Sequence, residues 1–134
     1  MSDSRLELVE RLFDAFNRRD EEDLAALCDE EMEFLAVTAE EVGRGAPYVG
    51  AGGLRQYLAD VAQVWEELLI TPEEVDGEGN RLLVRGRVYL RSRDLGIRDM
   101  PAAWIWETRE GRFVRGEVFV DPDLAERRFA GVPS

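Results

Sequence analysis

The sequence contains no histidine and no lysine, so all 17 of its basic residues are arginines. Histidine is the commonest general base and metal ligand near neutral pH, and its absence excludes a Ser-His-Asp triad. Lysine forms Schiff bases and contacts the phosphates of P-loops, so aldolase-type catalysis and Walker-type nucleotide binding are excluded as well. The protein therefore either catalyses a reaction with carboxylates, tyrosines and arginines or has no catalytic activity.

Cysteine is almost absent too. Cys28 is the single cysteine, which permits no internal disulfide and fits a reducing compartment, so we expect a cytoplasmic location. Because a lone cysteine on an apolar helix face usually packs, we interpret Cys28 as a core residue and not as a nucleophile.

Long apolar runs are also missing. No segment approaches the ~18 apolar residues of a membrane span, and the first residues lack the basic and apolar regions of a secretory signal. A formal net charge of −12 argues against nucleic acid and anionic membranes as partners. The 134 residues suit one domain, over 1–134, and we expect neither a metal nor another cofactor.

Apolar residues at helical spacing dominate the first half of the sequence. They predict a helix over 5–18 opened by a Ser4-Glu7 capping box, a short helix capped by Asp20 and reaching Cys28, and a third helix from Gly53 to about Glu67. Between the last two, residues 32–37 predict a strand and the glycine-rich residues 40–53 predict an extended loop.

The second half alternates apolar and polar residues and predicts four strands, at residues 69–75, 81–93, 101–109 and 112–120. Asp121 before Pro122 predicts the cap of a short last helix at 123–129, which explains this carboxylate better than a catalytic role does. The order of elements indicates an α+β fold in which the helices group against one face of a curved sheet.

Several short motifs, taken in their order, resemble the SnoaL-like branch of the nuclear transport factor 2-like superfamily. They are Tyr48-Val49-Gly50 before a helix, the arginine-rich stretch 82–93, Ala103 to Trp106 before Glu110-Gly111, and Arg115 with Phe119 to Asp121 before the last helix. The resemblance covers nearly the whole chain. It implies a cone-shaped mixed sheet wrapped around the three helices of the first half, a pocket between sheet and helices, and dimerisation through the outer sheet face.

The resemblance does not imply one activity, because this superfamily contains several enzymes and many members that only bind. Ketosteroid isomerases need a carboxylate base and two oxyanion donors, and alignment with them places Leu12, Leu35 and Ala102 at these positions. Alignment with limonene epoxide hydrolases places Gly86 and Val88 at the positions of their Arg-x-Asp motif. Relatives that use a His-Asp pair cannot be matched without histidine, whereas a cyclase that uses a single Asp is left open.

The resemblance further implies that the tryptophans of strand 101–109 face inward, where they clamp a flat ligand or fill the core. The residues expected to line the pocket are Leu12, Phe16, Leu35, Tyr57, Val61, Trp65, Val88, Ala102, Trp104, Trp106 and Val118. Candidates for catalysis are the hydroxyls of Tyr48 and Tyr57 and the carboxylates of Glu33 and Asp60, although ordinary structural and surface roles explain all four.

Strand 81–93 alternates arginines and Tyr89 on one face with apolar residues on the other, and the apolar face is predicted to meet the core. We expect the arginines to pair with acidic residues, Glu117 first, across neighbouring strands or a dimer interface, and not to grip an anionic ligand. The residues expected in a homodimer interface are Arg85, Arg87, Tyr89, Arg91, Glu107 and Glu117.

Three functions follow from this sequence. The first is binding of a small apolar molecule in an aromatic pocket, without catalysis. The second is an isomerase, cyclase or dehydratase acting on a polyketide-, steroid- or terpenoid-like substrate. The third is a dimerisation or partner-recruiting module whose pocket is filled by Trp65, Trp104 and Trp106.

Overall fold

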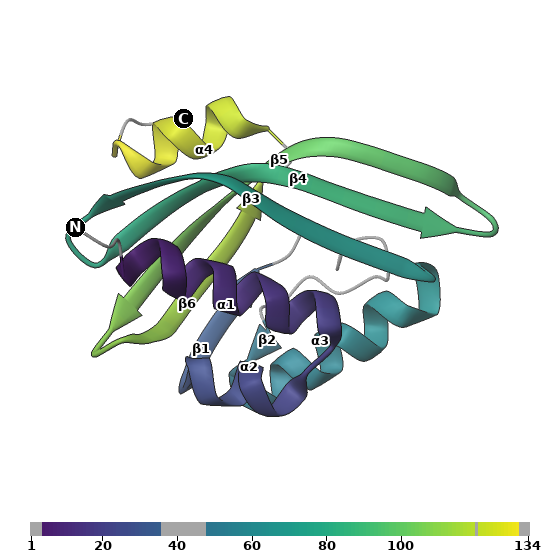
Figure 1. Cartoon of the computed structure of the whole chain (residues 1–134), viewed down its shortest axis with the longest axis horizontal. Helices are drawn as coiled ribbons and strands as arrows, with labels where there is room; N and C mark the ends of the chain where they lie inside the picture. Colours follow the sequence, from purple (N-terminus) through teal and green to yellow (C-terminus); the bar gives the residue numbers. More distant parts are fainter. Residues whose placement is uncertain (1–3, 36–47, 120, 132–134) are drawn as a thin grey trace.

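The computed structural model describes residues 4–35, 48–119 and 121–131. These residues form four helices and six strands (Figure 1). The helices are α1 (Ser4–Arg18), α2 (Glu21–Leu27), α3 (Gly50–Val64) and α4 (Pro122–Phe129). The strands are β1 (Cys28–Leu35), β2 (Tyr48–Val49), β3 (Glu67–Glu78), β4 (Arg81–Ser92), β5 (Gly96–Arg109) and β6 (Arg112–Phe119).

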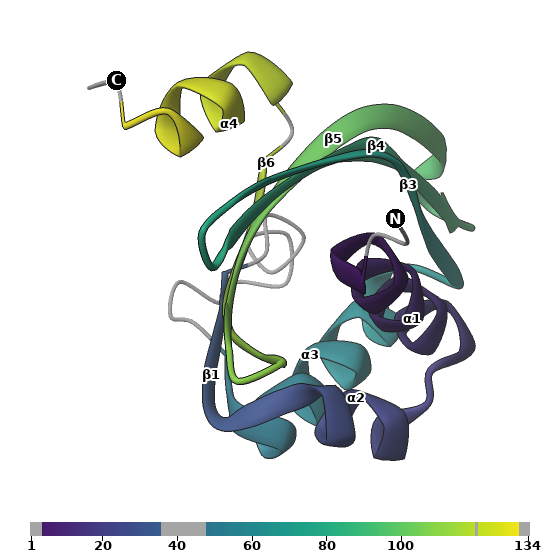
Figure 2. The ribbon, with the colours of Figure 1, turned by 60° about the vertical axis from the view of Figure 1, so that its left-hand side comes forward.

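The six strands form one mixed sheet in the order β2-β1-β6-β5-β4-β3. Strands β3 to β6 make the predicted antiparallel meander, and β1 joins it by pairing with β6 in parallel. Figure 2 shows that the sheet curves strongly and that α1 and α3 lie inside the curve. The predicted cone-shaped α+β fold is therefore confirmed.

Several boundaries in the first half differ from the prediction. Cys28 belongs to β1 and not to the second helix, which ends at Leu27. Helix α3 begins at Gly50, inside the predicted loop, and ends at Val64. Gly50 has a φ of 69°, a conformation that glycine adopts without strain, so this glycine turns the chain from β2 into the helix. The predicted strand residues 36–37 and loop residues 40–47 lie outside the described ranges.

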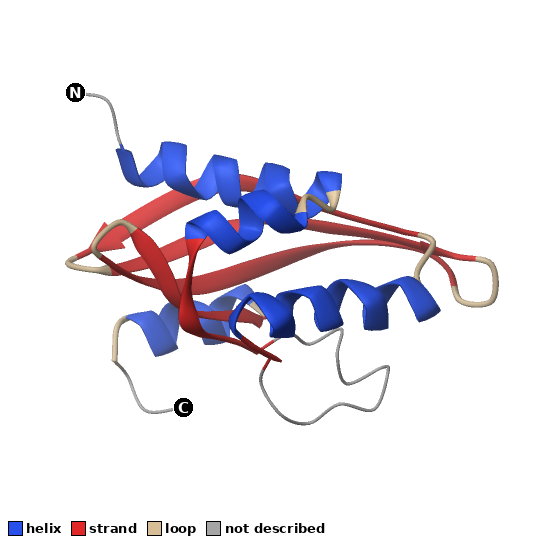
Figure 3. Cartoon of the chain, turned by 90° about the horizontal axis from the view of Figure 1, so that it is seen from below, coloured by secondary structure: helices blue, strands red, loops and turns tan. Residues whose placement is uncertain are grey.

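Two strands in the second half, β3 and β5, are longer than predicted. Strand β3 extends from Glu67 to Glu78, and β5 begins at Gly96, five residues before the predicted start. The β4–β5 hairpin therefore reaches past the ends of the helices (Figures 1 and 3). The tight turn at Glu110 and Gly111 is confirmed, and both residues have positive φ values, of 53° and 77°.

The main core lies between the concave face of the sheet and helices α1, α2 and α3. Val9, Leu12, Phe13 and Phe16 give α1 a continuous buried stripe, as their spacing predicts. Along β4 every second residue from Leu82 to Leu90 is buried on the same side. The apolar faces of the helices and of the alternating strands therefore pack against each other.

Helix α4 departs from the expected one-sided arrangement, because it packs on the outer face of the sheet (Figure 2). A second, smaller core forms there from Leu83, Ala103, Ile105, Phe119 and Ala125. Asp121 caps the helix as predicted, since its side chain accepts a hydrogen bond from the Asp123 amide at 3.0 Å. None of the helices in the described ranges combines the length and the hydropathy of a membrane span.

Candidate functional site

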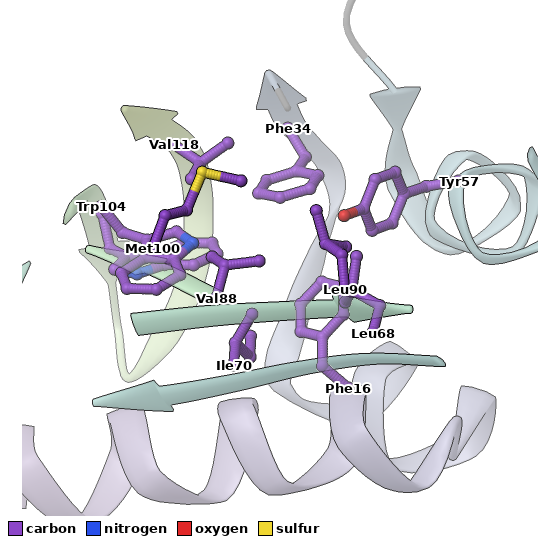
Figure 4. Close-up of a pocket in the computed structure, with 11 residues that line it drawn as sticks. Phe16, Phe34, Tyr57, Leu68, Ile70, Val88, Leu90, Met100, Trp104 and Val118 are labelled. Atoms are coloured by element: carbon purple, nitrogen blue, oxygen red, sulfur yellow. The ribbon is translucent and has the colours of Figure 1, made fainter. Parts of the chain in front are cut away.

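A cavity remains between the concave side of the sheet and helices α1 and α3, and Figure 4 shows its wall. Its volume is about 30 Å³. The residues that line it are Phe16, Phe34, Tyr57, Leu68, Ile70, Val88, Leu90, Met100, Trp104, Trp106 and Val118. Apart from the two indole N–H groups and the phenol hydroxyl, the wall is hydrocarbon and the thioether of Met100.

Strand alternation explains which side chains reach this cavity. On β5 the even-numbered residues from Met100 to Trp106 face inward, and each lies opposite an inward residue of β4 or β6, such as Val118 beside Trp104. The helices contribute Phe16 from α1 and Tyr57 from α3. The site is therefore built on rigid elements throughout.

Aromatic rings dominate one side of the cavity. The ring of Phe34 stacks on that of Trp106 with an interplanar angle of 3° and a centroid distance of 5.7 Å. Tyr57 meets Phe34 edge to face at 5.1 Å and Phe16 at 5.9 Å. Such edge and offset contacts hold the rings in fixed orientations, so this side of the wall is well ordered.

Six of the residues predicted to line a pocket do line the cavity: Phe16, Tyr57, Val88, Trp104, Trp106 and Val118. Leu12, Val61, Trp65 and Ala102 are buried in the same core but do not reach the cavity. Leu35 is half-buried and does not line it either, because Phe34 faces inward on β1 and adjacent strand residues point to opposite sides.

Five lining residues were not predicted: Phe34, Leu68, Ile70, Leu90 and Met100. The alternation of β4 carried a signal for Leu90, which shares a face with Val88. Leu68 and Ile70 stand in an apolar run with Leu69, and only the register of β3 shows that Leu69 faces outward. Met100 lies on the part of β5 that the sequence did not predict.

The predicted catalytic candidates do not converge in the cavity. The hydroxyl of Tyr57 points into it (Figure 4), whereas Tyr48 donates a hydrogen bond to Oδ2 of Asp60 at 2.8 Å. Gln56 donates to the other oxygen of Asp60 at 2.6 Å, and this carboxylate is partly exposed. Glu33 lies on the exposed side of β1. None of the described residues that line the cavity carries a carboxylate or a guanidinium.

The described residues provide neither a reactive thiol nor a metal site. Burial raises the pKa of the Cys28 thiol to about 12, so the thiol stays protonated at neutral pH and acts as a core residue, as the sequence predicts. Within the described ranges, no group of three or more cysteine and carboxylate side chains is arranged to hold a metal ion.

On the outer face of β4, Arg85, Arg87 and Arg91 form ion pairs within the chain. Arg85 contacts Asp76 at 2.7 Å and Glu126 of α4 at 2.7 Å, and the hydrogen bond to Asp76 is the main cause of its raised pKa. Arg87 contacts Asp99 at 2.9 Å. The predicted first partner of these arginines, Glu117, instead lies 3.7 Å from Arg128, because α4 crosses the sheet at that point.

Residues 9–116 match the sequence profile of the SnoaL-like domain. The chain belongs to the SnoaL-like family. A comparison of this SnoaL-like domain with curated proteins gives no match.

Solved structures share the fold of this SnoaL-like domain. TerC, crystallised with polyporic acid, is 21% identical with a TM-score of 0.80, over 93% of this chain and 97% of TerC. An NTF2-like protein of unknown function from Burkholderia pseudomallei is 20% identical with a TM-score of 0.79, over 94% of this chain and 97% of that protein. IdmH from Streptomyces antibioticus, a candidate polyketide cyclase, is 16% identical with a TM-score of 0.70, over 94% of this chain and 97% of IdmH. At these identities the likeness shows the NTF2-like fold alone.

Proposed function

We propose that this SnoaL-like domain binds a small, largely apolar molecule in the cavity between its concave sheet and helices α1 and α3. The observation that supports this proposal is a cavity whose wall is almost entirely apolar and aromatic. Protein interiors are close-packed and hold few voids larger than a water molecule. A cavity with a few polar groups in an apolar wall is the usual form of a small-molecule site.

The size of the cavity determines what binding requires. Its volume of about 30 Å³ is far below the roughly 300–1,000 Å³ of pockets that hold drug-sized ligands. A ligand must therefore displace part of the wall. Met100 is suited to move, because its side chain is unbranched and only half-buried. We infer that rotation of Met100 enlarges the cavity when a ligand enters.

Naphthalene, a flat apolar probe, tests this proposal. Binding stabilises a folded protein by about 2.7 kcal/mol at a ligand concentration 100 times the Kd. We expect naphthalene to raise the Tm of the parent protein and to change its tryptophan emission. Met100→Ala should bind naphthalene more tightly, since it removes the side chain that has to move. Leu95→Ala is the matched control, because Leu95 is exposed in the β4–β5 turn and does not line the cavity.

A filling variant completes the test. Val88→Phe should fill the cavity and abolish the response to naphthalene. If naphthalene leaves the Tm and the emission of the parent and of Met100→Ala unchanged, the binding proposal is wrong. The small volume would then favour the third function, a module with a filled pocket.

The catalytic alternative has less support. The hydrogen bond between Tyr48 and Asp60 brings a phenol and a carboxylate together, but neither residue lines the cavity. A proton donor or acceptor has to reach its substrate within hydrogen-bond distance. A cyclase, isomerase or dehydratase would need a different arrangement of these residues, so we propose binding without catalysis.

We also propose that two copies of the chain associate through the part of the outer sheet face that α4 leaves uncovered. Tyr89 lies there between Leu69 on β3 and Asp99 on β5, and Ile97 lies beside Arg91. Leu69 and Ile97 are exposed by 38% and 66%. Of the residues expected in the interface, Arg87, Tyr89 and Arg91 remain in this region. The other three, Arg85, Glu107 and Glu117, contact α4 or lie beside it.

A further inference from the structure

One polar group in the cavity wall is a buried hydrogen-bond donor without an acceptor in the part of the chain that the structure describes. Trp106 is fully buried, and its indole nitrogen Nε1 has no hydrogen-bond partner among the described residues. Nearly all buried N–H groups in proteins have an acceptor, because a buried donor without one loses its hydrogen bonds to water. An acceptor for this N–H is therefore expected from outside the described residues.

The Trp106 ring lies between strand β6 and the cavity. A Cβ atom at Gly116, the residue opposite on β6, would overlap Cζ3 and Cε3 of the ring. The benzene half of the indole thus lies on the backbone of β6. Nε1 belongs to the pyrrole half of the same ring, and the Trp106 side chain lines the cavity.

The remaining wall limits what the acceptor can be. The hydroxyl of Tyr57 enters the cavity from α3, on the far side from the sheet (Figure 4). No arginine lies among the described lining residues, so an ionised carboxylate would be buried without a cation. An uncharged oxygen on a flat apolar molecule satisfies the N–H without this cost, and the stacked rings of Phe34 and Trp106 offer a flat surface beside it.

We propose that the cavity selects uncharged ketones, with the carbonyl oxygen accepting a hydrogen bond from Nε1 of Trp106. This inference rests on the proposed binding function and adds a specificity-determining residue to it. A single water molecule is the other candidate acceptor, because about 30 Å³ accommodates one. If a ketone supplies the acceptor, the cavity should prefer ligands that have a carbonyl oxygen. If a water molecule supplies it, the cavity should show no such preference.

Acetophenone and α-methylstyrene form the test pair, because they have nearly the same shape and differ in a carbonyl oxygen against a methylene group. We expect acetophenone to bind about tenfold more tightly, the difference that one hydrogen bond makes. In ¹H–¹⁵N spectra of the three indole groups, acetophenone should move the Hε1 resonance of Trp106 downfield. α-Methylstyrene should not produce this shift.

Trp65 supplies a matched control. Its Nε1 is also buried without a partner among the described residues, but its side chain does not line the cavity. Trp106→Phe should bind both probes equally, whereas Trp65→Phe should keep the preference for acetophenone. The spectra of the parent protein test the inference even if Trp106→Phe does not fold.

Three results would overturn the inference. Equal binding of both probes with an unchanged Trp106 resonance would mean that water satisfies the N–H, and would leave the binding function intact. If acetophenone is preferred but shifts the resonance of Trp65, the donor is Trp65 and not Trp106. Failure of both probes and of naphthalene to bind would remove the proposed function together with this inference.

Discussion

At the scale of single residues, Gly116 and Trp106 form a tightly constrained contact in the core. The indole ring lies flat against the backbone of β6 because residue 116 has no side chain. Phe13, Phe34 and Phe113 surround the same ring at centroid distances of 6.2, 5.7 and 5.4 Å. With neighbours on several sides, the ring has little room to shift. One absent Cβ thus determines where the aromatic side of the cavity lies.

We predict that Gly116→Ala lowers the free energy of unfolding by about 1–3 kcal/mol, the usual cost of overpacking a close-packed core. The added methyl group overlaps Trp106, so the near-UV circular dichroism should change as well. Urea denaturation measures the first effect. Gly52→Ala is the control, because Gly52 is exposed in α3 and a Cβ there meets nothing within 4 Å. Equal stability of the two variants would contradict the prediction.

Cys28 gives a prediction for alkaline pH. Its pKa in the folded protein is about 12, against about 8.5 in an unfolded chain. Below pH 8.5 both states keep the thiol protonated and stability is unaffected. Above it only the unfolded chain ionises, so stability should fall by up to about 1.4 kcal/mol per pH unit until the folded pKa is reached.

Urea denaturation between pH 7 and about pH 10, on the parent and on Cys28→Ala, measures this slope. The difference between the two proteins isolates the contribution of the thiol. Identical slopes in both proteins would show that the buried thiol does not control alkaline stability.

At the scale of elements, strand β3 is the open edge of the sheet, and helix α1 closes part of it. The side-chain amide of Asn17 donates to the backbone oxygen of Ile70 at 2.9 Å, and its carbonyl accepts from the Ile70 amide at 2.8 Å. Asn17 thus makes the two hydrogen bonds that a neighbouring strand would make. Farther along β3, Pro72 and four acidic residues discourage pairing with another chain.

We predict that Asn17→Leu, which keeps the approximate size of the side chain, destabilises the protein by about 1–3 kcal/mol because two backbone groups of Ile70 lose their partners. The Ile70 amide should exchange its hydrogen faster with solvent. Asn17→Asp retains the acceptor for that amide and should protect it better than Asn17→Leu does. Unchanged exchange at Ile70 in both variants would show that the edge does not depend on this contact.

Elements whose apolar residues follow a single spacing, helical or alternating, could be predicted from the sequence. Boundaries where the two spacings overlap could not. Strand β4 alternates from Val84 onward, so its core face was evident. Cys28 fits both the helical spacing before it and the strand after it, so the end of α2 was misplaced by one residue. The glycines at the start of α3 indicate a loop, yet Gly53 is needed there because a Cβ would come 2.8 Å from the Tyr48 backbone.

The candidate site was predictable to the extent that it depends on strand alternation and on the family resemblance. Trp104 and Trp106 followed from both. Phe34 was missed because the alignment with relatives placed its neighbour Leu35 in the pocket, and adjacent residues of a strand point to opposite faces. Which buried residues reach a cavity, and which merely fill the core as Leu12 and Trp65 do, depends on the helix packing, for which the sequence carries no direct signal.

At the scale of the whole molecule, the outer face of the sheet is divided in two. Helix α4 covers one part through its small apolar core and the ion pair between Arg85 and Glu126. The other part, around Tyr89, presents exposed apolar side chains between charges of both signs. Mixed charges allow two copies to approach on this face although the chain as a whole is strongly acidic.

We therefore predict that the chain is a dimer in solution and that Ile97→Asp together with Leu69→Asp makes it monomeric. Both substitutions add a carboxylate to an apolar contact, where a second copy would bury two such charges without a partner. Light scattering coupled to size exclusion, across the micromolar concentration range, measures the mass. Leu6→Asp is the control, because it places the same charge on an exposed leucine of α1, on the other side of the sheet. A parent protein with the mass of one chain would contradict the prediction. A double variant that remains dimeric would show that the copies meet on a different surface, since the uncovered sheet face cannot hold four buried carboxylates.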